Sequence, residues 1–359
     1  MSLDGSQSIH GIITSPRQQM AILVRPRAWW YNKVPLSFLM LLLLVDGRQV
    51  TFALLVALLG LIGAVCSCGN YGYAINELFD RDEDRRAGRS NVAETVSRRG
   101  MWLIIAVSAM AAMVFAIAAG GRTGALLTTG ELILPLLYSV PPLRIKERRW
   151  LGVCADALAA HVYPAMLALA IVSHQSLRAP TLSLGLAAAV WSLATGLRGI
   201  LSHQIQSEAR DLGAGLVTIV HRLGYASARS LVVFVILPIE LLGFAAVLVQ
   251  CDLTIFAWGV AGIFLLYEFL KFRFNVFPVK VFTMKGERYV PFVDEGAYKV
   301  WGSLALAIDA AFSDPLYLVL VPVYFLLFRP RVLQEWRQIR QTGTAVRGNI
   351  RGFAARFRA

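Results

Sequence analysis

The sequence predicts an all-α polytopic membrane protein, and three observations support this prediction. Of the 359 residues, 57% are hydrophobic, which is a larger share than a soluble domain of this length usually carries. Apolar runs near or above the roughly 18–20 residues that cross a bilayer recur along the chain. Finally, lysine and arginine gather in alternate loops, as they do in membrane proteins of fixed orientation.

Ten membrane spans are expected, with ends placed to within several residues. The first five are Trp29 to Val45, Thr51 to Asn76, Met101 to Ala119, Gly124 to Val140 and Leu151 to Ser173. The second five are Leu182 to Leu201, Ala226 to Leu248, Leu253 to Leu270, Val300 to Phe312 and Pro315 to Phe328. The last two are short enough to form a re-entrant hairpin instead. The first 33 residues lack the short apolar core of a cleavable signal peptide.

Loop charge predicts the orientation of the bundle. One set of loops is short and holds only Arg48, Arg122 and Arg178 as basic residues, whereas the other set is long and basic. The positive-inside rule places the basic loops and both termini on the cytoplasmic side of the membrane, which we expect to be an inner or plasma membrane. The expected organisation is a cytoplasmic tail over 1–28, a transmembrane bundle over 29–328 and a basic cytoplasmic tail over 329–359.

The net charge of +13 fits membrane topology and contact with anionic lipid headgroups. We expect no nucleic-acid partner, because the chain shows neither a basic groove interleaved with aromatic residues nor a known nucleic-acid motif.

The first long loop begins with a regular polar pattern at the end of the second span. Asn76, Asp80 and Asp84 are spaced i, i+4, i+8, so they line one face if the helix continues past the membrane. Like charges stacked in this way repel unless a cation joins them. Hard oxygen ligands suit Mg²⁺, which proteins often hold by one or two carboxylates together with substrate phosphates.

A second polar pattern follows 127 residues later and indicates an internal repeat. The offset carries the motif at 76–91 onto 203–218, so that His203, Ser207 and Asp211 take the places of Asn76, Asp80 and Asp84. This second copy has fewer carboxylates. Asp211 is its main candidate ligand, helped by the neighbouring Glu208 or Gln204, and His203 is a candidate substrate contact.

Basic residues near these two motifs are candidates for binding phosphate oxygens. The segment from Tyr138 to Arg148 contains Pro141-Pro142, which ends the fourth span and leaves Arg144 and Lys146 near the membrane surface. Arginine can grip a diphosphate with two parallel hydrogen bonds, and lysine acts as a point charge. Arg25, Lys33 and Arg198 are candidates for the same role, and ordinary membrane anchoring is the alternative for all five.

Together these residues resemble the UbiA-type superfamily of intramembrane aromatic and lipid prenyltransferases. Asn76, Glu77, Asp80 and Asp84 match the family's first motif. The stretch from Tyr138 to Lys146 matches a Tyr-Ser-x-Pro-Pro-Leu-Arg-x-Lys pattern, and Asp211, Gly215 and Thr218 match the end of the second motif. The chain departs from the family at Ser207, where an aspartate is common, and at His203, where Asn or Asp is common. The chlorophyll synthase branch also has serine at the position of Ser207, so serine there is compatible with activity. The departure bears instead on the class of acceptor.

The resemblance implies a bundle of about nine or ten helices around a central cavity, with a polar cap facing the cytoplasm and an opening to lipid. It implies Mg²⁺-dependent transfer of a prenyl group from a prenyl diphosphate to an aromatic or lipid-like acceptor. Asn76, Asp80 and Asp84 would hold one Mg²⁺, and Asp211 with Glu208 or Gln204 a second. Arg144 and Lys146 would cover the diphosphate, Tyr138 is a candidate contact to the reacting group, and Asp156 is the best candidate on the acceptor side.

Related activities stay open at this stage. A membrane terpene cyclase and a transferase of phosphoribosyl groups to polyprenyl phosphate would use the same kind of metal–diphosphate site. A transporter or lipid-binding scaffold would explain ten spans and a repeat, but it would not explain aspartates at fixed spacing beside a Pro-Pro-Leu-Arg-x-Lys segment.

Overall fold

The computed structural model describes residues 30–45, 51–86, 88, 91–213, 217–277 and 287–356, with side chains throughout these ranges except at 86, 209–213 and 352–356. Regular structure in these residues is helical. The helices are α2 (Trp30–Leu44), α3 (Phe52–Arg86), α4 (Arg98–Ser139), α5 (Trp150–Ala157), α6 (Tyr163–His174), α7 (Leu182–Gly213), α8 (Ile219–Leu223), α9 (Tyr225–Leu231), α10 (Leu237–Leu248), α11 (Ile255–Phe274), α12 (Gly302–Ala311) and α13 (Leu320–Arg356). The all-α class is therefore confirmed.

Helix α2 lies at the centre of the bundle. All its residues from Val34 to Leu44 are buried, which is the pattern of a helix that is apolar on every side and surrounded by other helices. It packs against α3, α6 and α12. The first apolar run of the sequence is thus the core of the fold, although by itself it is shorter than its neighbours.

Helix α4 is a helical hairpin folded at Gly121, whose φ of 58° and ψ of −145° interrupt the helical geometry. Asn70 donates a hydrogen bond to Ser108 in the first limb (3.1 Å), and Ser139 in the second limb donates one to Asn76 (3.0 Å). Both limbs therefore lie against the same stretch of α3. Glycine suits the turn because a positive φ is strained for residues with a Cβ.

Ten helical segments within the described ranges coincide with the ten expected spans. Seven helices are long and apolar enough to cross a membrane by length and composition, one of them being the folded α4. The other two segments, α2 and α12, are shorter. Short π-helical turns join α5 to α6 at Leu158–Val162, join α9 to α10 at Val232–Ile236 and precede α12 at Ala297–Trp301.

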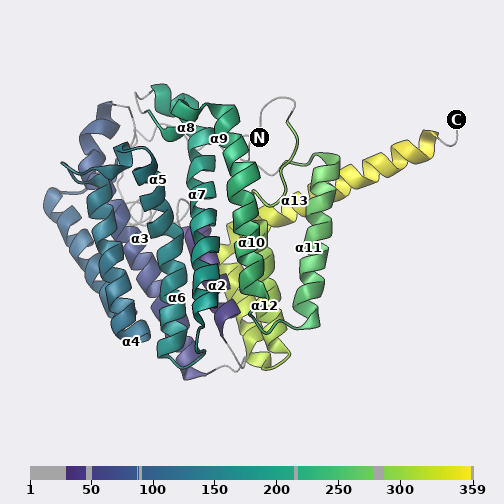
Figure 1. Cartoon of the computed structure of the whole chain (residues 1–359), viewed down its shortest axis with the longest axis horizontal. Helices are drawn as coiled ribbons and strands as arrows, with labels where there is room; N and C mark the ends of the chain where they lie inside the picture. The colour runs from purple at the N-terminus through teal and green to yellow at the C-terminus, as the bar shows by residue number, and fades with distance from the viewer. Residues whose placement is uncertain are drawn as a thin grey trace.

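The internal repeat predicted from the motifs extends to whole helices. Helices α3 and α7 both run past the span length and end at Arg86 and Gly213, which are 127 positions apart. The next spans begin with α4 at Arg98 and with α9 at Tyr225, again 127 positions apart; the short helix α8 precedes the second of them. Because the helices run alternately up and down, the loops that follow α3, α4, α7 and α11 all fall at one end of the bundle, the end at which α8 lies in Figure 1.

Helix α13 continues past the expected end of the bundle. It is interrupted at Phe328 (φ −120°, ψ 23°) and then runs on to Arg356. In Figure 1 this second part leaves the bundle beside α11 and runs across the direction of the other helices. The sequence led us to expect only a basic tail from residue 329, and the structure shows a helix there.

Candidate functional site

The first polar motif lies on α3, as the spacing predicted. The helix continues without a break through Asn76, Asp80 and Asp84, so these three side chains share one face at the end of the bundle that carries the long loops. Asp80 is largely buried, with 10% of its side chain exposed. A carboxylate in that position needs a cation or several hydrogen bonds to stay charged.

Two cations meet Asp80 from the loop between α4 and α5. The Arg144 guanidinium lies 3.1 Å from the Asp80 carboxylate, and the Lys146 ammonium contacts the same oxygen. Arg144 also contacts Glu83. Its backbone is left-handed (φ 34°, ψ 55°), a strained conformation for a residue with a side chain. The structure thus brings together the first motif and the basic segment that sequence reasoning paired with it.

Asn91 fixes the far end of the same motif. Its amide donates to the Asp84 carboxylate (2.8 Å) and to the backbone carbonyl of Glu77 (2.9 Å), while its own oxygen accepts from the Ala93 amide (2.8 Å). The Glu77 carboxylate accepts from the amide of Val92 (2.8 Å). Asn91 is 4% exposed, so the loop after α3 folds back onto the helix and orients Asp84.

The second polar motif lies at the end of α7, in the position equivalent to the first. His203 is exposed, Gln204 and Glu208 are partly exposed, and Ser207 is buried. The side-chain oxygen of Gln204 is buried and has no hydrogen-bond partner among the described residues. The side chain of Asp211, the predicted ligand, lies outside the described part of the structure.

Further ionisable side chains lead from the first motif into the bundle. The charges of Asp156 and Asp80 both act on Tyr138, and those of Lys33 and Asp156 act on Glu131. These residues come from α2, α3, α4 and α5, so Asp156, Lys33 and Tyr138 lie in one polar interior, and their predicted roles stay predictions. Ionisable groups within spans are costly and are often functional.

His161 lies deeper, on the π-helical turn between α5 and α6. It is 6% exposed, and its Nδ1 atom has no hydrogen-bond partner among the described residues. The charges of Lys33 and Glu295 act on it. A π-helical turn inside an α-helix is frequently found at a functional site.

Arg198 occupies a different environment from Arg144 and Lys146. It is 1% exposed and donates to both carboxylate oxygens of Glu240 (2.5 and 2.9 Å), to the Val293 carbonyl (2.8 Å) and to Glu295 (3.2 Å). These internal contacts engage all three guanidinium nitrogens. The structure therefore gives Arg198 a packing role, and the expected contact with diphosphate stays a prediction.

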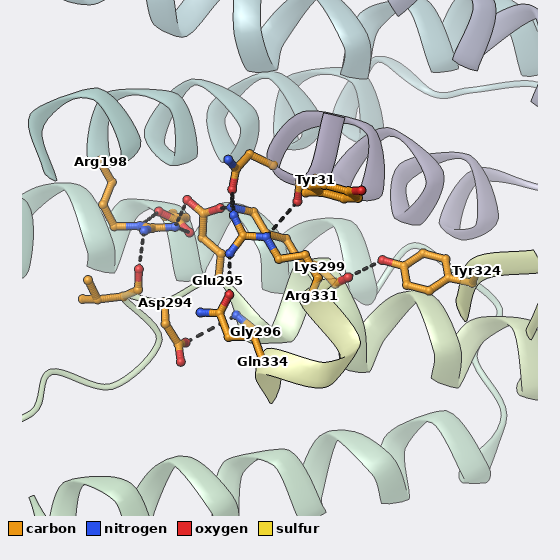
Figure 2. Close-up of polar contacts among 12 residues, drawn as sticks. Tyr31, Arg198, Asp294, Glu295, Gly296, Lys299, Tyr324, Arg331 and Gln334 are labelled. Carbon is orange, nitrogen blue, oxygen red and sulfur yellow. Dashed lines mark hydrogen bonds and ion pairs between the residues drawn. The ribbon is translucent and has the colours of Figure 1, made fainter. Parts of the chain in front are cut away.

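The segment that precedes α12 completes this network, as Figure 2 shows. Glu295 also contacts Lys299, which donates to Asn32 on α2 (3.3 Å). Burial opposes ionisation of Glu295, but the neighbouring charges of Lys299 and Arg198 outweigh it and hold the pKa of this carboxyl well below its usual range. Arg331 of α13 contacts Asn32 and donates to the Tyr31 carbonyl (3.0 Å).

Among the described side chains, no three from His, Cys, Asp and Glu lie close enough to form a metal site on their own. The predicted ligand set differs from such a group in two ways. It includes Asn76, which is an amide, and it includes Asp211, whose side chain lies outside the described part of the structure. Arg25, another predicted substrate contact, also lies outside the described residues.

Comparison with known sequences identifies the family. The sequence pattern of the UbiA prenyltransferase family matches residues 34–276, which is more than half of the chain and includes both polar motifs. The chain belongs to the UbiA prenyltransferase family. No functionally curated protein matched the sequence.

The fold of this UbiA-family chain is also similar to solved structures. One is a UbiA homolog from Archaeoglobus fulgidus bound to Cd²⁺, with a TM-score of 0.56 and 20% identity over 82% of this chain and 98% of that chain. Structures of a UbiA homolog from the same organism bound to GPP and Mg²⁺, and to DMAPP and Mg²⁺, each give a TM-score of 0.51 and 17% identity. Each covers 91% of this chain and 99% of that chain. At this identity the likeness shows the fold.

Sequence reasoning missed several residues of the polar interior. Asn91 carried a signal, because it belongs to the repeated spacing, but its bond to Asp84 depends on how the loop returns. Glu295, Lys299 and Arg331 carried none, since they lie beyond the family match and their neighbours along the chain are ordinary loop and helix residues.

Proposed function

We propose that this chain transfers a prenyl group from a prenyl diphosphate to an aromatic or lipid-like acceptor within the membrane, with Mg²⁺ as its cofactor. The observation that carries the proposal is the placement of Asp80 between Arg144 and Lys146, on the helix face shared with Asn76 and Asp84. The Mg²⁺ and prenyl diphosphates bound by the similar Archaeoglobus proteins support it.

The residues present fit a magnesium ion. Asn76, Asp80 and Asp84 offer hard oxygen atoms on one face, and Mg²⁺ bound by one or two carboxylates takes its remaining ligands from water and substrate phosphates. On the second motif, the unpartnered buried oxygen of Gln204 is a further donor of the same type. We assign Asn76, Asp80 and Asp84 to one Mg²⁺ and Asp211, with Glu208 or Gln204, to a second. When bound, Mg²⁺ supplies charge that stabilises the leaving diphosphate.

The basic loop has the geometry to bind the same diphosphate. Arg144 and Lys146 already lie within contact distance of Asp80, so phosphate oxygens bound next to that carboxylate come within their reach. As the allylic C–O bond breaks, negative charge grows on the diphosphate, and fixed cations aimed at that charge lower the barrier. The contacts of Arg144 with Asp80, Glu83 and Glu147 hold the guanidinium in place before substrate arrives.

Hydrogen bonds from neighbouring side chains orient the motif. Asn91 donates to Asp84, and Ser139 donates to Asn76, so both ligand side chains are held by a neighbouring side chain. Partners of this kind typically tune a metal site strongly, because they fix the direction of the ligating atoms.

The apolar helices would protect the reacting carbon. An allylic cation meets water readily, so transfer to an acceptor requires a site from which water is excluded. We assign Asp156 to the acceptor side of this site, and Tyr138, which lies within electrostatic reach of Asp156, to contact with the reacting group.

The test is turnover of a labelled prenyl diphosphate by purified protein across a Mg²⁺ titration. Asp80→Ala and Asp84→Ala should each lower kcat/KM by about 100-fold or more, the scale seen when one electrostatic partner of a transition state is removed. Asp82→Ala is the matched control, because Asp82 is an exposed carboxylate on the same helix two residues from Asp80, and therefore on another face.

Equal turnover in all three variants would refute the assignment. The acceptor requirement separates the related activities: a transferase releases diphosphate only when an acceptor is present, whereas a cyclase consumes the prenyl diphosphate alone.

A further inference from the structure

The second part of α13 has a composition unlike the rest of the bundle. Between residues 329 and 351 it contains six arginines and one acidic residue, Glu335. Glu335 is buried, with 5% exposed. The exposed surface of this stretch is therefore wholly cationic in its charge, and it begins directly after the interruption of the helix at Phe328.

Large apolar side chains are exposed on the same stretch. Leu333 is 41% exposed, Trp336 57% and Ile350 61%. At about 100° per residue along a helix, these three and four exposed arginines fall within an arc of roughly 140°. These four arginines are Arg337, Arg340, Arg347 and Arg351, and a fifth exposed arginine, Arg329, follows Phe328 directly. Near the opposite side of the helix lies Asn349, which is exposed and uncharged.

This combination of side chains matches one kind of surface. A helix exposed to water on all sides gains nothing from an uncovered tryptophan beside leucine and isoleucine, and a span buried in lipid would not place four arginines on its outer face. A helix lying in the membrane–water interface uses both, because its aromatic and aliphatic groups enter the acyl boundary while its cations meet headgroup phosphates.

The direction of the helix agrees with that placement. In Figure 1 the second part of α13 crosses the direction of the spans and extends beyond α11 towards the level of α8. A helix that runs across the spans and reaches the level of the loops can lie along the surface of a bilayer that the bundle crosses.

We propose that residues 329–351 form an interfacial helix that binds the anionic phospholipids of the leaflet at the motif-bearing end of the bundle. Charge complementarity selects anionic over neutral lipid, since this exposed surface carries five arginines and no carboxylate among the described side chains. A nucleic acid would satisfy the arginines but would leave Ile350 and Leu333 in water.

Contacts with the bundle fix the first turns of this helix. Trp301 donates to Glu335 (3.1 Å), and Arg331 is fixed to Asn32 and to the Tyr31 carbonyl. Figure 2 shows Arg331 beside Lys299 in the polar interior. Because both contacts fall within the first turns after the interruption, they set the direction in which the rest of the helix leaves.

The test uses spin labels on full-length protein in lipid nanodiscs. The four cysteines are free, so they are replaced by alanine and a single cysteine is introduced as Trp336→Cys or Asn349→Cys. Collision with oxygen, which concentrates in lipid, is compared with collision with a water-soluble nickel chelate. Discs contain phosphatidylcholine alone or with phosphatidylglycerol.

In discs with phosphatidylglycerol, the label at 336 should collide with oxygen at least about twofold more, relative to nickel, than the label at 349. Replacing Arg337, Arg340, Arg347 and Arg351 by glutamine should remove most of this difference, as should high salt. An unchanged melting temperature and prenyl diphosphate turnover would show that the quadruple variant is folded.

Equal accessibility at 336 and 349 would overturn the proposal. A difference of the same size in pure phosphatidylcholine would overturn the selection of anionic lipid. Protection of position 336 that appears only when a second protein is added would overturn it in favour of a protein partner.

Discussion

Asn91 offers a sharp test of how the first motif is held, because it touches Asp84 without belonging to the predicted ligand set. Asn91→Ala removes three hydrogen bonds of 2.8 to 2.9 Å. One of them is the bond to the Asp84 carboxylate, and hydrogen bonds to charged groups contribute about 1.5–3 kcal/mol each. If that orientation is what the ligand requires, the loss corresponds to roughly 10- to 100-fold in Mg²⁺ affinity.

The assay is the Mg²⁺ concentration that gives half-maximal turnover of a labelled prenyl diphosphate. Asn91→Ala should raise it by about 10-fold or more, while saturating Mg²⁺ restores part of the rate. Asn70→Ala is the matched control, since Asn70 lies on α3 and donates a single hydrogen bond to Ser108 (3.1 Å) away from the motif. If the two variants shift the Mg²⁺ dependence equally, Asn91 does not act by orienting Asp84.

Three further predictions concern the bundle itself. Arg198→Met leaves Glu240 buried without its cation and should destabilise the protein by about 3–5 kcal/mol. The double variant Arg198→Met with Glu240→Leu should recover part of the melting temperature measured in detergent. A loss in the double variant equal to the sum of the two single losses would contradict this. The depressed pKa of Glu295 means that its stabilising charge is fully present above the ordinary carboxyl pKa and is lost as pH falls below it, so the acid-side decline of melting temperature should be shallower in Glu295→Gln. Gly60→Ala would bring its Cβ to 2.2 Å from a methyl group of α4, whereas Gly130→Ala meets nothing within 4 Å, so only the first should lower the melting temperature.

Local pattern was enough to predict most of the fold. Apolar run length predicted the ten helical segments, and the Pro141-Pro142 pair correctly placed the end of α4. The tight turn at Gly121 was expected only as a short loop, and the helical backbone after Phe328 was missed. That stretch is rich in arginine and glutamine, which form helices well, but its charge suggested a solvated tail.

In the candidate site, too, local pattern predicted some features and missed others. The spacing of Asn76, Asp80 and Asp84 predicted their shared face, because a continuing helix repeats every 3.6 residues. The roles of Arg198 and Arg144 could not be told apart from the sequence, since both are cations near the end of a span. Only the structure shows that Arg198 is enclosed by internal carboxylates, whereas Arg144 faces the motif.

The sequence by itself therefore determined the class of protein, the order of the apolar helical segments along the chain and the helix face that carries the first motif, because these depend on residue type and periodicity within short stretches. The tertiary structure decided which cations meet Asp80, that Asn91 orients Asp84, and that Lys299 and Arg331 join Asn32 in the polar interior. Such contacts link residues as far apart as Asn32 and Arg331, and they form only when the folded bundle brings distant segments of the chain together.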